Sequence, residues 1–296
     1  MNKYAAIIID IKDSRKMHNK DRIFAQDKLY DIIQFINAIY ADVLIKKVEF
    51  SAGDSIQGLF KDLRNAFNAY LFIRNLFYPF HLRCGIGYAS IRGFIDKKYD
   101  EFTTNMIDGR AYHLANEAIL ECKESENAFL VYSEYAKDDI LVNQIMHTVD
   151  LLLNEQTKNQ ADICNFFNLI YPINYHNLTI DTTKYCMYLI DTLSKNHYTY
   201  NFSTNNEDLN LYIELMKEIY HNTRKNQYDQ QNMNYETHTF YEDMFPTKLD
   251  VLLADFLQTS RQNIAKIKQK SHADEIRKLE LCVMSYFENI YDKGRN

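Results

Sequence analysis

The sequence predicts an α+β protein of 296 residues, with a mixed front half and a helical back half. Apolar patterns typical of strands and of helices alternate over residues 1–140. Six of the seven glycines lie between Gly53 and Gly109, where tight turns and close backbone approaches are therefore expected. Further on, apolar residues recur at helical spacing, as Leu211, Leu215 and Ile219 do.

The front half is expected to begin with a buried strand, because residues 4–10 form a continuous apolar run. Apolar residues at spacings of three and four then predict an amphipathic helix, and "KKVEFSAGDSIQGLF" predicts two strands joined by a tight turn. The expected elements are strand 4–10, helix 21–42, hairpin 46–60, helix 64–78, strand 82–91, helix 110–123 and strand 128–132. The order β-α-β-β-α-β is that of a ferredoxin-like or palm domain.

Changes in composition suggest four regions. Residues 1–140 form the predicted palm domain, and 141–221 form a helical connector. Residues 222–245 are predicted to be an exposed polar linker, because seven of the first fifteen are Asn or Gln. Residues 246–296 close the chain as a compact helical domain.

Composition excludes several classes of protein. The net charge of −6 argues against binding nucleic acid through bulk charge, although a local basic element remains compatible with it. The five cysteines are scattered without a CxxC pair, which predicts buried thiols and a reducing, cytoplasmic location rather than disulfides or a zinc site. No apolar run is long enough to span a bilayer, so no membrane partner is expected.

Two aspartates stand where the predicted palm would bring them together. Asp10 ends the first buried strand, and Asp54 lies in the hairpin turn. An ionised carboxylate beside a buried strand is costly unless it is paired or binds a metal. Each has a simpler interpretation, because Asp10 suits a turn and Gly53-Asp54 suits a hairpin. Together they predict a site for Mg²⁺ or Mn²⁺, to which the Ile11 carbonyl adds an oxygen ligand.

Four segments carry a resemblance to known proteins: "IIIDIKDS", "FSAGDSIQGLF", "HLRCGIGYASI" and "DGRAYHLANEAI". In order and spacing they resemble the landmarks of class III nucleotide cyclases, whose metal-binding aspartates fall at Asp10 and Asp54. The first two resemble more closely the SatD family, bacterial proteins with a cyclase-like front domain and a helix-turn-helix tail. "LLNEQTKNQADI" (152–163) is similar to a Thr-x-x-Gln stretch of SatD-like chains. The resemblance implies a class III cyclase-like palm that binds a nucleotide.

The sequence departs from the cyclase pattern at three positions. Phe50 stands where cyclases carry a base-selecting lysine, and His113 and Glu117 stand where they carry a transition-state Asn and Arg. Loss of a cation aimed at developing phosphoryl charge costs on the order of 10³-fold in rate. The cations that could substitute are Arg83, Arg92 and Arg110. The resemblance thus favours nucleotide binding over turnover.

The predicted nucleotide-binding residues surround the two aspartates in the motifs. They are Ser14, Gly53, Ser55, Arg110, His113 and Asn116. The enzymatic alternative is an active cyclase or nucleotide polymerase that uses two Mg²⁺ ions at Asp10 and Asp54. Such an enzyme would be a phosphorus-oxygen lyase or a nucleotidyltransferase.

"LADFLQTSRQNIAKIKQKS" (253–271) predicts a helix-turn-helix. Ala254 is the small residue for the helix crossing, Ser260 is a ready N-cap, and Gln258 replaces the usual turn glycine. Four basic and no acidic residues lie between Ser260 and Ser271, which predicts binding to DNA bases and phosphates. The predicted DNA-binding residues are Ser260, Arg261, Gln262, Asn263, Lys266 and Lys268. The alternative is a solvated surface helix of an ordinary bundle.

Three functions follow from these features. The first is a regulator whose palm binds a nucleotide and whose tail binds DNA, as a homodimer. The second is a nucleotide-forming enzyme with a regulatory tail, and the third is an interaction protein with two degenerate modules. The retained aspartates argue against the third, and the missing cyclase residues favour the first over the second.

Overall fold

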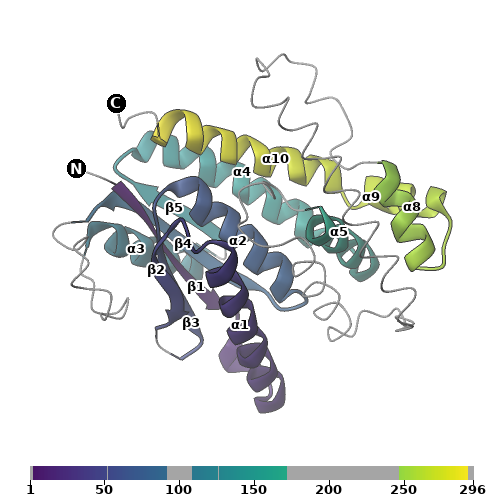
Figure 1. Cartoon of the computed structure of the whole chain (residues 1–296), viewed down its shortest axis with the longest axis horizontal. Coiled ribbons are helices and arrows are strands. Elements are labelled where there is room, and N and C mark those ends of the chain that lie inside the picture. The colour runs from purple at the N-terminus through teal and green to yellow at the C-terminus, as the bar shows by residue number, and fades with distance from the viewer. Residues whose placement is uncertain (1–2, 52, 92–108, 126, 172–246, 293–296) are drawn as a thin grey trace. The chain divides into compact units, whose positions relative to one another are not determined.

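The computed structural model describes residues 3–51, 53–91, 109–125, 127–171 and 247–292. A five-stranded sheet lies at the centre of the front half (Figure 1). Its strands are β1 (Lys3–Ile11), β2 (Leu44–Phe50), β3 (Ser55–Phe60), β4 (Leu82–Ser90) and β5 (Phe129–Ser133). Their order is β2-β3-β1-β4-β5, with β1 antiparallel to both its neighbours and β5 parallel to β4.

Helices lie between the strands in the predicted order. They are α1 (Asn19–Ile39), α2 (Leu63–Phe77) and α3 (Arg110–Ser125), with a short 3₁₀ turn η1 (Ser14–Lys16) after β1. Helix α4 (Ala136–Asn154) follows β5. The predicted strands and helices are confirmed to within one helical turn, and so is the mixed α+β class. The predicted linker 222–245 and most of the predicted helical connector lie outside the described residues.

Helices cover both faces of the sheet. The Phe129 ring lies 5.4 Å from the Phe67 ring of α2, whereas its neighbour Leu130 packs in a cluster with Ala118 and Ile119 of α3. Adjacent strand residues point to opposite faces, so α2 and α3 lie on opposite sides (Figure 1). The core therefore occupies two layers, one on each side of the central strand β1.

Two strand glycines set the distance between α3 and the sheet. A β-carbon at Gly87 would lie 1.9 Å from the Ala111 carbonyl oxygen, and one at Gly85 would lie 2.4 Å from that of Ala115. Real β-carbons do not approach backbone atoms so closely, so only glycine allows α3 this position. The sequence signal is a Gly-x-Gly strand that matches the small residues Ala111, Ala115 and Ala118 on α3.

The chain divides into two compact units. Unit 1 comprises residues 1–151 and 279–296, and unit 2 comprises residues 152–278. The boundaries lie within α4 and within α10 (Ala273–Tyr286). The C-terminal end of the predicted tail domain 246–296 thus belongs to the unit that contains the sheet.

The C-terminal segment is built into unit 1 by apolar and polar contacts. Phe287 is buried, with its ring 5.5 Å from that of Phe67. The Tyr291 hydroxyl donates to Asp139 Oδ1 at 2.7 Å, and Arg74 Nη2 donates to Glu280 Oε1 at 2.5 Å. The local order of this segment therefore depends on residues from the front of the chain.

Unit 2 contains α5 (Lys158–Ile170), α8 (Thr247–Phe256) and α9 (Arg261–Lys270) among its described residues. Thr157 begins α5 with a capping box, in which its hydroxyl accepts from the Gln160 N–H and the Gln160 side chain accepts from the Thr157 N–H. The Thr-x-x-Gln stretch is thus a helix start. No helix in the described part of the chain is long and apolar enough to cross a membrane.

Candidate functional site

The first candidate site lies at the end of β1 where Asp10 stands. Asp10 is directly opposite Ser55 on β3 and directly opposite Arg83 on β4. Residues opposite each other in antiparallel strands present their side chains on the same face. A serine, a carboxylate and a guanidinium therefore form a row across three strands, on the face that α3 covers.

The turn between β2 and β3 brings Asp54 to the same end of the sheet. Gly53 adopts a φ of 64°, which glycine tolerates best, and the turn closes through a hydrogen bond from the Ser51 N–H to the Ser55 carbonyl at 2.9 Å. Asp54 directly precedes Ser55, the residue opposite Asp10. Asp10 and Asp54, the two carboxylates predicted to bind a metal, therefore lie at the same end of the sheet.

Lysine side chains pair with Asp10 and with the nearby Asp13. Lys123, near the end of α3, places its Nζ 3.0 Å from Asp10 Oδ2. Lys16 Nζ lies 3.0 Å from Asp13 Oδ1, and this hydrogen bond lowers the pKa of Asp13. Sequence reasoning missed Lys123, because its contact with Asp10 depends on where α3 crosses the sheet.

The other residues that the sequence predicts to bind the metal or the nucleotide at this end of the sheet are less exposed to solvent. Ile11 is buried, and its backbone is paired with Leu82 of β4. Ser14 is also buried and begins the 3₁₀ turn. Ser51 and Ser55 bring their hydroxyl oxygens within 2.7 Å of each other in the hairpin. Ser55 is thus the predicted nucleotide-binding hydroxyl nearest to Asp10.

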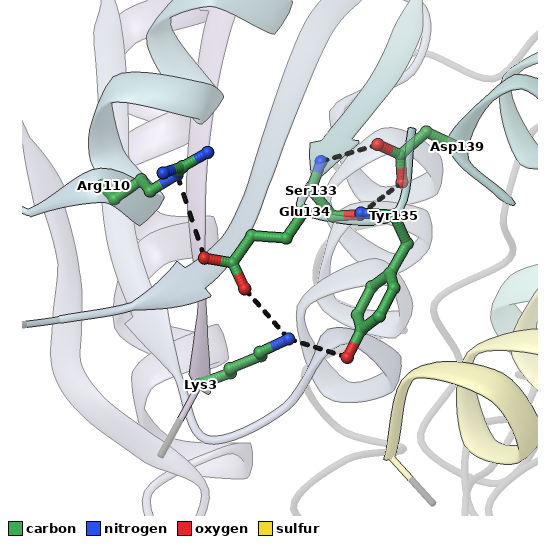
Figure 2. Close-up of polar contacts among 6 residues, drawn as sticks. All are labelled: Lys3, Arg110, Ser133, Glu134, Tyr135 and Asp139. Atoms are coloured by element: carbon green, nitrogen blue, oxygen red, sulfur yellow. Dashed lines mark hydrogen bonds and ion pairs between the residues drawn. The ribbon is translucent and has the colours of Figure 1, made fainter. Parts of the chain in front are cut away.

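Arg110 lies at the other end of the sheet (Figure 2). Its Nε is 3.9 Å from Glu134 Oε1, and Glu134 also pairs with Lys3 at 3.0 Å, at the start of β1. Lys3 and Asp10 are seven strand residues apart, or about 23 Å. Within one copy of the chain, Arg110 therefore does not act on a ligand held at Asp10.

His113 and Asn116 lie on the exposed side of α3, between Arg110 and Lys123. Glu117, at a position where cyclases carry a catalytic side chain, is exposed there too. The structure thus splits the predicted nucleotide-binding set. Ser14, Gly53 and Ser55 lie near the aspartates, whereas Arg110 and His113 lie toward the far end of α3.

The donor chemistry near Asp10 suits a hard cation. The described residues hold no cluster of three or more His, Cys, Asp or Glu side chains fit to bind a metal. Two carboxylates are nevertheless typical of Mg²⁺, which keeps several waters and shares phosphate oxygens. The thiols of the sheet take no part, because burial raises the pKa of Cys122 to about 12 and that of Cys84 well above its usual value.

The second candidate site is the pair of helices α8 and α9 in unit 2. In the turn between them, Gln258 has a φ of 49°. This is the position at which a helix-turn-helix usually carries glycine. The Thr259 N–H donates to the Ala254 carbonyl at 2.9 Å, and Ala254 is buried. Ser260 caps α9 as predicted, accepting from the Asn263 N–H at 3.2 Å.

Most of the predicted DNA-binding residues lie on the exposed surface of α9. Arg261, Gln262, Asn263 and Lys266 are exposed, and Ile264 is buried behind them. Lys268 is different, because only 6% of it is exposed and its Nζ donates to Asp250 Oδ1 of α8 at 3.1 Å. Lys268 therefore stabilises the pairing of α8 with α9. Its amine does not face solvent, as a side chain that contacts DNA phosphate would.

Two glutamines that were not among the predicted site residues bind the C-terminal end of α9. Gln156 Nε2 donates to the Ser271 carbonyl at 2.5 Å, and Gln160 Nε2 donates to the Lys270 carbonyl at 3.4 Å. The last carbonyls of a helix lack partners within the helix, so these amides satisfy them. The start of α5 thus fixes the end of the exposed helix α9.

The left-handed turn gives a test of this geometry. We expect Gln258→Gly to raise the free energy of unfolding of unit 2 by about 0.5–1 kcal/mol, because glycine adopts a positive φ without steric cost. Urea denaturation and hydrogen exchange of the α8 and α9 amides measure the effect. Gln262→Gly, within helical backbone, is the matched control and should destabilise by up to about 1 kcal/mol. Equal losses for the two variants would contradict the assigned turn.

The described fold is mixed α+β, with a five-stranded sheet and a helical C-terminal region. The family model described as the SatD family matches residues 4–186, which is more than half of the chain. The chain belongs to the SatD family, as its first motifs predicted. The match includes β1–β5, α4 and α5 and ends before α8. A comparison with curated proteins found no match.

Proposed function

We propose that this SatD-family protein is a regulator in which a cyclase-like palm binds a divalent metal and a nucleotide, and a helix-turn-helix binds DNA. The observation that carries the proposal is the α8–α9 pair. A tight turn, a buried small residue at Ala254 and a capped helix present Arg261, Gln262, Asn263 and Lys266 to solvent. These side-chain types bind base edges and phosphates in helix-turn-helix proteins.

The arrangement of the sheet supports the palm. The β2-β3-β1-β4 order follows from a β-α-β-β-α-β chain, as in ferredoxin-like domains. It places Asp10 beside the hairpin that carries Asp54. Asp10, Asp54 and the Ile11 carbonyl would hold Mg²⁺ or Mn²⁺, and the metal would neutralise phosphate charge.

Binding without turnover is favoured by where the cations lie. Arg110 pairs with Glu134 at the end of the sheet away from Asp10, and Phe50 and Glu117 bring no cation to a transition state. Arg83, opposite Asp10, would supply a guanidinium to a bound phosphate in this proposal. Ser55 supplies a hydroxyl on the same face.

In a homodimer, the exposed residues of α3 could contact a ligand that is bound at Asp10 of the other copy. Arg110, His113 and Asn116 lie on one helix, at a distance from Asp10 within their own copy. We infer that a second copy packs against this helix with the end of its sheet that carries its own Asp10. The proposed regulator is therefore a homodimer, which also suits a palindromic DNA site.

The enzymatic alternative rests on the two carboxylates at one edge. An active cyclase or nucleotide polymerase would use two metal ions there. Incubation of the full chain with each ribonucleoside triphosphate and Mg²⁺ or Mn²⁺, followed by chromatography, separates the two functions. Binding without a new product supports the regulator, and a cyclic or linked nucleotide would make the protein an enzyme.

DNA binding has a direct test. We expect Arg261→Ala with Gln262→Ala to weaken binding to a duplex selected from a random-sequence pool by at least about tenfold, through lost base contacts. Fluorescence anisotropy measures the affinity. Arg22→Ala with Gln144→Ala changes the same residue types on exposed positions of unit 1 and should leave the affinity unchanged. An unaltered affinity in the α9 variant, with an unaltered melting curve, would refute the DNA-binding assignment.

A further inference from the structure

The carboxylate proposed to bind the metal already has a cation beside it. Lys123 Nζ lies 3.0 Å from Asp10 Oδ2, with the Asp10 side chain 13% exposed and the Lys123 side chain 45% exposed. A divalent ion at Asp10 would compete with this amine, because both cations are attracted to the same carboxylate. The amine can leave, since it ends a flexible four-carbon chain that is half in solvent.

The helix that carries Lys123 is held in place more firmly than the side chain. Backbone atoms of Ala111 and Ala115 pack against Gly87 and Gly85, which leaves α3 no room to move toward the sheet. Lys123 lies about two turns after Ala115 on the same helix. Its amine is therefore always within reach of Asp10, and its departure needs only a change of rotamer.

A second cation, Arg83, has one guanidinium nitrogen without a hydrogen-bond partner among the described residues. Arg83 is directly opposite Asp10 on β4, and its Nε is buried with no hydrogen-bond partner among the described residues. A buried donor without a partner costs free energy that a bound oxyanion would recover. Lys123, once displaced from Asp10, would face the same space as Arg83.

We propose that Lys123 is an internal counter-ion that competes with the divalent metal for Asp10 and, once displaced, binds ligand phosphate together with Arg83. The inference rests on the proposed metal site and adds its regulation. Without a phosphate ligand, Lys123 lowers the affinity of the metal for the protein. With a metal-bound phosphate, the amine gains a new partner, so metal and phosphate bind cooperatively.

Titration of the full chain with Mn²⁺ alone, followed by electron paramagnetic resonance, tests the competition. We expect Lys123→Gln to raise the Mn²⁺ affinity by about two- to fivefold, the upper part of the range for ion pairs that reach solvent. Lys123→Arg keeps the charge and should bind Mn²⁺ as the natural chain does. Lys16→Gln removes a neighbouring cation that pairs with Asp13 rather than Asp10, and should change the affinity less than about twofold.

Asp10→Asn distinguishes failure of the inference from failure of the metal site. If Asp10→Asn weakens Mn²⁺ binding but Lys123→Gln does not strengthen it, the competition is refuted and the metal site stands. If Asp10→Asn leaves Mn²⁺ binding unchanged, both are refuted.

A measurement on the natural chain gives an independent result. Labelling of lysine amines by an acylating reagent, read by peptide mass spectrometry, should become faster at Lys123 when Mn²⁺ is added, because the amine leaves Asp10. Labelling of Lys16 should not change. An unchanged rate at Lys123 under saturating Mn²⁺ would overturn the proposal.

Discussion

Glu280→Ala is expected to lower the free energy of unfolding of unit 1 by about 3–5 kcal/mol, because it leaves a buried guanidinium without its counter-ion. Arg74 Nη2 lies 2.5 Å from Glu280 Oε1, and Glu280 is 1% exposed. Burial alone would lower the pKa of Arg74, but Glu280 beside it raises that pKa overall. A guanidinium does not lose its proton in proteins even without Glu280, so Arg74 stays charged in the variant and loses its counter-ion.

Urea denaturation monitored by circular dichroism measures this effect. Glu288→Ala is the matched control, since Glu288 pairs with Arg64 at 3.2 Å in the same segment but is half-exposed. Its loss should be below about 1 kcal/mol. Arg74→Met combined with Glu280→Leu should recover much of the stability by removing both charges. Equal losses of unfolding free energy for Glu280→Ala and Glu288→Ala would show that burial does not make the Arg74–Glu280 pair more important for stability.

Gly87→Ala is the second change with a large expected effect. The added β-carbon would lie 1.9 Å from the Ala111 carbonyl oxygen and 2.4 Å from the Ala115 nitrogen, both of them backbone atoms of α3. Neither atom can turn away as a flexible side chain can, so the helix must shift from the sheet. We expect a loss of about 3 kcal/mol, at the upper end for an overpacked core.

Gly53→Ala separates this clash from the general cost of replacing glycine. Among the described residues beyond its chain neighbours, no atom lies within 4 Å of a β-carbon built at Gly53, so the cost comes from the left-handed φ of 64° and should be about 1 kcal/mol. Thermal unfolding ranks the two variants, and hydrogen exchange along α3 shows whether the helix loosens in Gly87→Ala alone. A Gly87→Ala chain as stable as Gly53→Ala would contradict the close packing of α3.

Sequence reasoning succeeded where the determining interactions are local. The apolar run at 4–10, the amphipathic helix patterns and the turn residues predicted the order of β1 to β5, because each depends on neighbours within one or two turns. The N-cap at Ser260 follows the same rule, since the Asn263 N–H that it accepts from is three residues away. The left-handed backbone at Gln258 was not predictable in this way, because the sequence has glutamine where the usual turn glycine would have signalled it.

Interactions between distant segments were not predictable in this way. The sequence by itself determined the α+β class, the strand and helix order, the cap and turn of α9, and the presence of carboxylates at a strand end and in a hairpin turn. Only the tertiary structure decided that Lys123 pairs with Asp10 and that Lys268 is buried against Asp250. It also decided that Arg110 lies at the far end of the sheet, and that Glu280 pairs with Arg74, which is 206 residues away in the chain. The physical reason is that such contacts depend on strand register and on the distance between packed backbones, which no pattern of neighbouring residues contains.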